Sequence, residues 1–495
     1  MATATHHREK APIGVPGLDN ILVGGLARGQ VYLVEGSPGA GKTTLSLQFL
    51  LQGAKNGETS LYITLSETEH ELRDGAASHG WTLDERIKIF ELRPPDENDQ
   101  QTLLYSSDLE LGETIKRIFK TVDEVRPSLI VLDSLAEIRL LAESPLRYRR
   151  QVLALKHHFA RINATVLMLD DLSADKPDKT LHSTAHGVIR LEELAPSYGA
   201  ERRRLRVLKY RGQSYRSGFH DLVLKRGGLH VFPRLIASEH RTQLKRIKLA
   251  SGTAQLDELL GGGIDSGSST LVLGPAGAGK SLLALHFAMS AIKRGERAAI
   301  FAFDEELGVL FERGRGMGID LEAAAKEGSL LIEQQDAAEL SPGEFAHKVR
   351  RLVEDEAVGT IVIDSLNGYQ ASMPEEHFII LHMHELLQFL NRKGAATFVT
   401  VAQHGLVGED MKSPVDITYL ADTVILLRYF EAAGRIRRAI SAMKKRTGSH
   451  ENTIREFQIG QGGITLGAAL TEFRGVLQGV PVYMGGDVPL LDAGT

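Results

Sequence analysis

The chain of 495 residues contains no cysteine, which excludes disulfide bonds, cysteine-ligated zinc and thiol nucleophiles. It has no run of about 18 apolar residues, so no transmembrane helix is expected, and its first residues lack the apolar segment of a secretory signal. Positive charge is not in excess, since the formal net charge is −5. This balance argues against a nucleic-acid-binding protein. We therefore expect a cytoplasmic protein with no membrane or nucleic-acid partner.

A long internal repeat organises the chain. "GSPGAGKTTL" begins at Gly36 and "GPAGAGKSLL" begins at Gly274, which is 238 residues later (274 − 36). The residues before each loop match at the same offset without a gap. A repeat of this length indicates tandem domains rather than a solenoid of short units. The sequence predicts an N-terminal domain over residues 1–238 and a C-terminal domain over residues 239–495.

Within each copy, short apolar runs alternate with helix-length segments. The first copy reads "QVYLVEG", "KTTLSLQFLLQGAKNG", "TSLYITLSE", "PSLIVLDS" and "ATVLMLDD" in turn. Strands that are apolar throughout indicate a mostly parallel sheet that helices cover on both faces. The pattern predicts an α/β fold in both domains, with ligands bound at the carboxyl ends of the strands.

The glycine-rich loops match the phosphate-binding pattern G-x-x-x-x-G-K-[ST]. Glycines let backbone N–H groups surround phosphate oxygens, and the helix that follows directs its positive end toward them. The lysine of each loop reaches the β- and γ-phosphates. We predict ATP as the ligand. The predicted binding residues are Gly36, Ser37, Pro38, Gly39, Ala40, Gly41, Lys42, Thr43 and Thr44 in the first copy, and Gly274, Pro275, Ala276, Gly277, Ala278, Gly279, Lys280, Ser281 and Leu282 in the second.

Each loop is accompanied by candidate ligands for Mg²⁺. The hydroxyl of Thr43 or Ser281 follows the loop lysine directly, where it can bind the ion. Asp133 in "LIVLDSL" and Asp364 in "TIVIDSL" end apolar strands, as a metal-orienting aspartate does in P-loop enzymes. We predict Thr43 with Asp133 and Ser281 with Asp364 as the two metal sites.

Acidic residues follow the strand after each loop helix and are candidates to activate water. Glu67 lies in "LYITLSETE", whereas Asp304 and Glu305 lie in "IFAFDEEL". A carboxylate near the γ-phosphate can accept a proton from the attacking water. The alternative is that Ser66 or Asp304 is the N-cap of a solvated helix. The matched positions favour the catalytic interpretation.

One cationic pair occurs near the end of each repeat. Lys209 and Arg211 lie in "LKYRG", and Lys444 and Arg446 lie in "MKKRTG". Residues two apart on a strand project from one face, and such cations can stabilise the γ-phosphate bound by a neighbouring subunit. The alternative is that these cations only form a charged, solvated strand edge.

Taken together, these motifs resemble the KaiC family, the double-domain RecA-like P-loop ATPases of the cyanobacterial clock and their bacterial relatives. The resemblance covers nearly the whole chain, from "GLDNILVGGLARG" to "TEFRGVLQGVP". It implies a two-tiered homo-hexamer with ATP between subunits, slow hydrolysis in the N-terminal ring and autophosphorylation in the C-terminal ring. It also implies that Glu67 activates water and that the cationic pairs reach the adjacent nucleotide.

The family's phosphoacceptors are an adjacent Ser-Thr pair, and the matching positions are Thr418 and Tyr419 in "DITYLADTVILL". Thr418 is the expected acceptor, because the longer Tyr419 side chain would overshoot the same phosphate. Ser66 stands where the family usually has a glutamate, which predicts altered hydrolysis in the first ring. A KaiB-type partner is expected for the first ring, whereas the short tail gives little support for control by KaiA.

Two other functions fit a tandem P-loop chain. One is a DNA-stimulated RecA-type motor, against which stand the acidic net charge and the duplication. The other is a non-catalytic scaffold held together by bound ATP, against which stand the retained lysines, aspartates and acidic segments.

Overall fold

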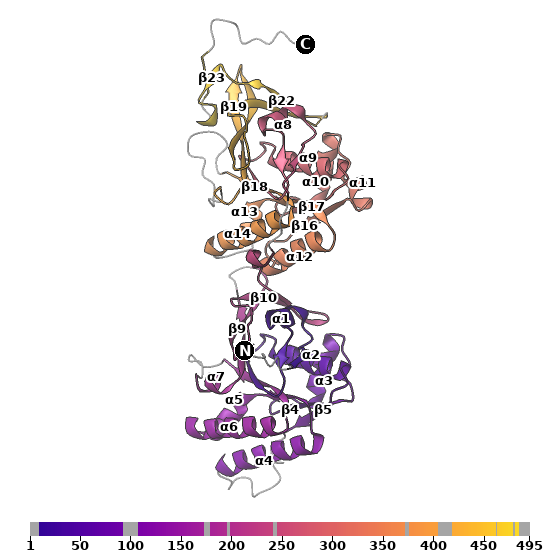
Figure 1. The fold of residues 1–495 in the computed structure, drawn as a ribbon, viewed down its shortest axis with the longest axis vertical. Helices are drawn as coiled ribbons and strands as arrows, with labels where there is room; N and C mark the ends of the chain where they lie inside the picture. The colour runs from indigo at the N-terminus through magenta and orange to yellow at the C-terminus, as the bar shows by residue number, and fades with distance from the viewer. Residues whose placement is uncertain are drawn as a thin grey trace, which may run out of the picture. The chain divides into compact units, whose positions relative to one another are not determined.

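The computed structural model divides the chain into two compact units, Met1–Arg234 and Leu235–Thr495 (Figure 1). The predicted boundary at 238/239 lies close to this division. The residues that the structure describes are 9–92, 107–172, 179–195, 199–240, 245–371, 376–403, 418–461, 463–478 and 481–484.

The first unit is built on a nine-stranded sheet with the order β11-β10-β9-β8-β3-β7-β6-β4-β5. The strands from β8 to β5 pair in parallel, and β9, β10 and β11 continue the sheet in antiparallel pairing. The bounds are β3 (Val31–Gly36), β4 (Ser60–Thr64), β5 (Ile87–Glu91), β6 (Leu129–Asp133), β7 (Thr165–Asp171), β8 (Gly187–Leu194), β9 (Arg202–Tyr210), β10 (His220–Lys225) and β11 (Gly228–Phe232).

The second unit repeats this sheet strand for strand, in the order β16-β15-β17-β18-β14-β19-β20-β21-β22. The bounds are β14 (Ser269–Gly274), β15 (Arg297–Ala302), β16 (Leu330–Gln334), β17 (Val358–Asp364), β18 (Ala396–Ala402), β19 (Thr423–Ala432), β20 (Arg435–Lys445), β21 (Arg455–Gly460) and β22 (Gly463–Ala469). The prediction of two α/β domains with mostly parallel sheets is confirmed.

Helices flank both sheets (Figure 1). Those of the first unit are α1 (Pro16–Ile21), α2 (Lys42–Lys55), α3 (Glu69–Ser78), α4 (Ser107–Val125), α5 (Leu135–Ala142), α6 (Pro145–Arg161) and α7 (Lys179–Thr184). Those of the second are α8 (Ala254–Leu259), α9 (Lys280–Lys293), α10 (Leu307–Gly316), α11 (Leu321–Lys326), α12 (Pro342–Glu354), α13 (Leu366–Ala371) and α14 (Glu376–Lys393). In the described part of the chain, no helix combines the length and apolarity needed to cross a membrane.

Short elements complete the fold. Three two-stranded pairs are β1 (Lys10–Ala11) with β2 (Leu26–Ala27), β12 (Lys248–Leu249) with β13 (Ile264–Asp265), and β23 (Phe473–Arg474) with β24 (Val482–Tyr483). Among the described residues, 3-10 turns occur at η2 (Ala237–His240) and η3 (Val476–Gln478).

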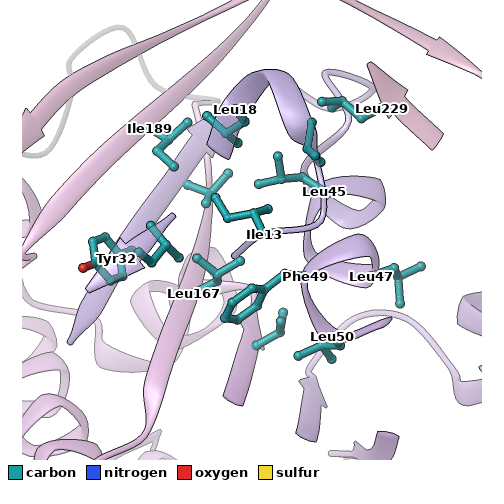
Figure 2. Close-up of a cluster of buried hydrophobic side chains, with 14 of the residues drawn as sticks. Ile13, Leu18, Tyr32, Leu45, Leu47, Phe49, Leu50, Leu167, Ile189 and Leu229 are labelled. Atoms are coloured by element: carbon teal, nitrogen blue, oxygen red, sulfur yellow. The ribbon is translucent and has the colours of Figure 1, made fainter. Parts of the chain in front are cut away.

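The central strand β3 is buried on both faces, which explains why its sequence is apolar without alternation. Tyr32 and Val34 belong to the hydrophobic cluster on one face of the sheet, whereas Val31 and Leu33 belong to the cluster on the other. Figure 2 shows the first of these clusters, where Phe49 of α2 faces the sheet. The two clusters hold β3, and therefore the loop at its end, in a fixed position.

Replacing Phe49, which is fully buried, by alanine is expected to lower the free energy of unfolding of the first unit by about 3–5 kcal/mol. Trp81 is the chain's single tryptophan and packs against the same cluster, so its fluorescence reports on this unit. The measurement is the urea midpoint of Trp81 fluorescence in the full-length protein.

The matched control is Phe287→Ala, which removes a buried ring of the second unit that stacks on Phe398. This variant should leave the urea midpoint of Trp81 fluorescence unchanged. Far-UV circular dichroism should show that part of the secondary structure is lost at a lower urea concentration than in the parent protein. An unchanged Trp81 midpoint in Phe49→Ala would contradict the assigned packing.

Candidate functional site

Both glycine-rich loops lie at the carboxyl end of a central strand and run directly into a helix. Gly41 and Gly279 occupy the N-cap positions of α2 and α9 with φ angles of 100° and 104°, and no side chain caps either helix. Neither helix has an acidic residue in its first turn. The backbone N–H groups of these first turns can therefore bind an anion. The loops fit phosphate.

Gly279 is also required for steric reasons, because a Cβ atom at that position would lie 2.5 Å from Cδ1 of Ile459. The corresponding atom on Gly41 would lie 3.2 Å from Cδ1 of Leu229. With a positive φ as well, each position requires glycine. The motif glycines therefore reflect both the turn and the packing of the neighbouring strands.

The two loop lysines are equally buried but have different partners. The ammonium of Lys42 donates to the carbonyl oxygens of Gly36 and Ser37, both at 2.9 Å, and lies 2.7 Å from a carboxylate oxygen of Asp171. Lys280 donates to the carbonyl oxygen of Pro275 at 2.8 Å. Burial lowers the pKa of Lys280, against the opposing effect of nearby carboxylates.

Asp133 and Asp364, the aspartates predicted to bind Mg²⁺, are the last residues of β6 and β17. The hydroxyl of Tyr62 donates to Asp133 at 2.5 Å. Burial raises the pKa of Asp133, while its hydrogen bonds with Tyr62 and Thr43 act in the opposite direction. Asp364 accepts a hydrogen bond from Thr400. Thr43 and Asp133 thus present a hydroxyl and a carboxylate side by side, which fits the oxygen ligands that Mg²⁺ prefers.

Glu67 follows β4 and its backbone is fixed by Thr64. The Thr64 hydroxyl accepts from the Glu67 N–H at 2.9 Å and donates to the Glu67 carbonyl oxygen at 2.7 Å. Burial raises the pKa of Glu67, and the charges of Asp133, Glu71 and Asp171 raise it further. A half-buried carboxylate with a raised pKa beside a phosphate loop is suited to accept a proton.

The N-cap alternative for this segment is wrong. The N-cap of α3 is Thr68, which forms a capping box with Glu71, and the N-cap of α10 is Glu306, which makes no side-chain capping bond. Neither Ser66 nor Asp304 caps a helix.

The acidic residues of the second copy are engaged by local partners. The hydroxyl of Ser365 donates to Asp304, and Arg313 lies 2.9 Å from a carboxylate oxygen of Glu305. Burial raises the pKa of Glu305, and Arg313 partly offsets that effect. The first copy has Gly75 at the position of Arg313 (313 − 238). The two candidate bases therefore differ in charge environment.

Comparison with known proteins decides the family. A model of the KaiC ATPase matches residues 11–236 and again residues 249–470. The chain belongs to the KaiC family. It is 27% identical over 483 residues to the circadian clock protein KaiC3 of Synechocystis sp. (strain ATCC 27184 / PCC 6803 / Kazusa), covering 96% of this chain and 95% of the relative.

Two further relatives carry the description circadian clock oscillator protein KaiC. The protein of Parasynechococcus marenigrum (strain WH8102) is 27% identical over 482 residues, covering 96% of this chain and 93% of the relative. That of Thermostichus vulcanus is 26% identical over 488 residues, covering 97% and 93%. The similarity thus spans both units, as expected for duplicated KaiC domains.

In the first KaiC domain, the cationic pair at the end of β9 binds a short helix of the same chain. Lys209 donates to the carbonyl oxygens of His182 and Ala185, and Arg211 donates to that of Ser183 at 2.6 Å. The pair thereby donates to carbonyl oxygens at and just after the C-terminal end of α7, where a helix offers no intrahelical donors to its last carbonyl groups.

The second KaiC domain repeats this arrangement around the predicted phosphoacceptor. Lys444 donates to the carbonyl oxygens of Thr418 and Ala421 at 2.9 and 2.8 Å, and Arg446 donates to that of Tyr419. Thr418 is half-buried, whereas the side chain of Tyr419 is exposed. The cations therefore contact backbone carbonyl oxygens of the segment that carries the candidate acceptor.

Sequence reasoning missed the charged residues that surround the first loop. Asp170 lies 2.7 Å from Arg139, and burial raises the pKa of Asp170 to about 6. Glu35 is 2% exposed and contacts His182 and Arg190 at 2.8 and 2.6 Å. The signal was present as acidic residues at the ends of the apolar strands "VYLVE" and "LMLDD".

Replacing Tyr62 by phenylalanine is expected to weaken binding of Mg²⁺ with ATP at the first site by about tenfold. The substitution removes a hydrogen bond that stabilises ionised Asp133, so the pKa of that carboxyl rises further. Binding is measured by titration with fluorescently labelled ATP in protein carrying Lys280→Ala, which disables the second site.

Thr400→Val is the matched variant for the second site, since Thr400 donates to Asp364. In Lys42→Ala protein, Thr400→Val should weaken ATP binding at the second site. In Lys280→Ala protein, the same substitution should leave ATP binding at the first site unchanged. Unchanged affinity in Tyr62→Phe would show that Asp133 does not support the metal.

Proposed function

We propose that this KaiC-family chain is a Mg²⁺-dependent ATPase that assembles as a double-ring homo-hexamer, with each nucleotide bound between subunits. One observation carries the proposal. In each copy the loop lysine, a hydroxyl, a strand-end aspartate and a half-buried glutamate follow the carboxyl ends of neighbouring central strands. This is the arrangement that phosphoryl transfer requires, because the groups hold phosphate, metal and water together.

In the first ring, Glu67 is the proposed general base. Its carboxylate accepts a proton from a water molecule whose oxygen forms the new bond to the γ-phosphorus, while the bond to the β-phosphate oxygen breaks and ADP leaves. Lys42 holds the transferred phosphate, and bound Mg²⁺ supplies positive charge to the phosphate oxygens. The raised pKa of Glu67 makes the carboxylate a better proton acceptor near neutral pH.

In the second ring, we propose that the hydroxyl of Thr418 takes the place of water. Lys444 and Arg446 hold the backbone of this segment, which fixes the acceptor residue beside these two cations. The proton passes to Asp304 or Glu305 of the subunit that binds the nucleotide. A KaiB-type protein is the proposed partner of the first ring, and the relatives' descriptions as clock proteins support a regulatory role.

Glu67→Gln is expected to lower ATP turnover at the first site by about 10²-fold or more, the range of a lost general base. Turnover is measured as phosphate release by Lys280→Ala protein. Because the pKa of Glu67 is raised, activity of the parent protein should fall as the pH drops through a value above the ordinary glutamate range, and Glu67→Gln should lose this acid limb.

Glu71→Gln is the control, because Glu71 is fully exposed and its charge contributes to the raised pKa of Glu67. This variant should move the acid limb to lower pH and keep the plateau rate. A pH profile that Glu67→Gln leaves unchanged would remove Glu67 from the mechanism.

Incubation with γ-labelled ATP is expected to place label on Thr418, located by mass spectrometry. Thr418→Ala should abolish the label, whereas Tyr419→Phe should retain it. Release of phosphate without protein labelling would leave an ATPase that lacks autokinase activity.

Assembly is tested separately by sedimentation in saturating ATP, where a hexamer is expected. A protein that sediments as a single chain and still turns over normally would contradict sites shared between subunits.

A further inference from the structure

The ammonium of Lys42 already has three acceptors. A lysine ammonium carries three N–H groups, and those of Lys42 face two loop carbonyl oxygens at 2.9 Å and one oxygen of Asp171 at 2.7 Å. The Lys42 side chain is 9% exposed and that of Asp171 is 33% exposed. A phosphate oxygen that binds Lys42 must therefore compete with the carboxylate of Asp171.

Strand pairing places Asp171 against the loop. Asp171 is the last residue of β7 and stands opposite Gly36 in the parallel register with β3. The next residue, Leu172, donates its N–H to the Gly36 carbonyl oxygen at 3.1 Å. The position of the carboxylate thus follows from the sheet itself rather than from a surface loop.

The second copy has the same backbone and a different side chain. Ala402 ends β18 and stands opposite Gly274, and the N–H of Gln403 reaches the Gly274 carbonyl oxygen at the same 3.1 Å. Within the described residues, Lys280 makes no ion pair, and burial lowers its pKa. An anionic ligand at Lys280 has no carboxylate at this position to displace.

The charge of Asp171 also acts beyond Lys42. Asp133 ends β6, which pairs in parallel with β7, so the carboxylates of Asp133 and Asp171 share the region at the carboxyl ends of these strands beside the loop. A triphosphate brings one more phosphate charge into this region than a diphosphate does, and like charges at short range disfavour binding. The carboxylate should therefore oppose ATP more than ADP.

We propose that Asp171 is a specificity-determining residue of the first nucleotide site, competing with the terminal phosphate for Lys42 so that this site's preference for ATP over ADP is reduced. The proposal rests on the proposed function, since it requires nucleotide at Lys42. The second site, with Ala402 in the same place, does not have this competition. The difference between Asp171 and Ala402 therefore gives the two loops different preferences for ATP over ADP.

The test measures affinities for fluorescently labelled ATP and ADP in the full-length protein, with Lys280→Ala isolating the first site. Asp171→Asn keeps the shape of the side chain and removes its charge. It should tighten ATP binding by about tenfold, the effect of one charged hydrogen bond, and tighten ADP binding less. Glu113→Gln, an exposed carboxylate on α4, removes the same charge elsewhere and should change neither affinity.

The reciprocal experiment introduces the carboxylate into the second site. In Lys42→Ala protein, Ala402→Asp should weaken ATP binding by a similar factor, and Ala402→Asn should not, which separates charge from size. Circular dichroism verifies that each variant is folded, and if Ala402→Asp fails to fold, Asp171→Asn decides the question alone.

Equal or weaker ATP binding in Asp171→Asn, or an unchanged ratio of the ATP and ADP affinities, overturns the inference. Failure of the proposed function looks different, because then neither single-site protein binds the labelled nucleotides at all.

Discussion

A buried ammonium needs acceptors, and the structure around each loop is organised by this requirement. Lys42 and Lys280 are both 8% exposed, and each begins the helix that follows a central strand enclosed by two hydrophobic clusters. Removal from water disfavours the charged lysine unless carbonyl or anionic oxygens replace the lost hydration. Loop carbonyl oxygens meet part of this need in both copies. What else surrounds the ammonium decides how strongly each site attracts phosphate.

The duplicated units keep one architecture and differ in electrostatics. Their sheets have the same strand order, yet Glu35 is replaced by Leu273 and Asp171 by Ala402 at matching register positions. The strand-end aspartates are held by a tyrosine in one copy and a threonine in the other. Because the backbone is shared, these side chains alone can give the two sites different tasks.

Lys209 with Arg211, and Lys444 with Arg446, connect each sheet to a segment that differs between the copies. Lys209 and Lys444 both bind two carbonyl oxygens of the chain that precedes β8 and β19. In the second unit this segment carries Thr418. These hydrogen bonds hold the Thr418 segment against the second sheet.

The sequence by itself determined the repeat, the phosphate loops and the α/β class, because glycine spacing and uninterrupted apolar strands are local patterns with direct physical causes. It also located Asp133 at the end of a strand and Glu67 just after one. Only the tertiary structure decided what those residues touch. Asp171 is 129 residues from Lys42 (171 − 42), and Tyr62 is 71 residues from Asp133. Such contacts depend on which strands are neighbours and in which register they pair, and that outcome is set by the packing of the whole sheet rather than by any local stretch.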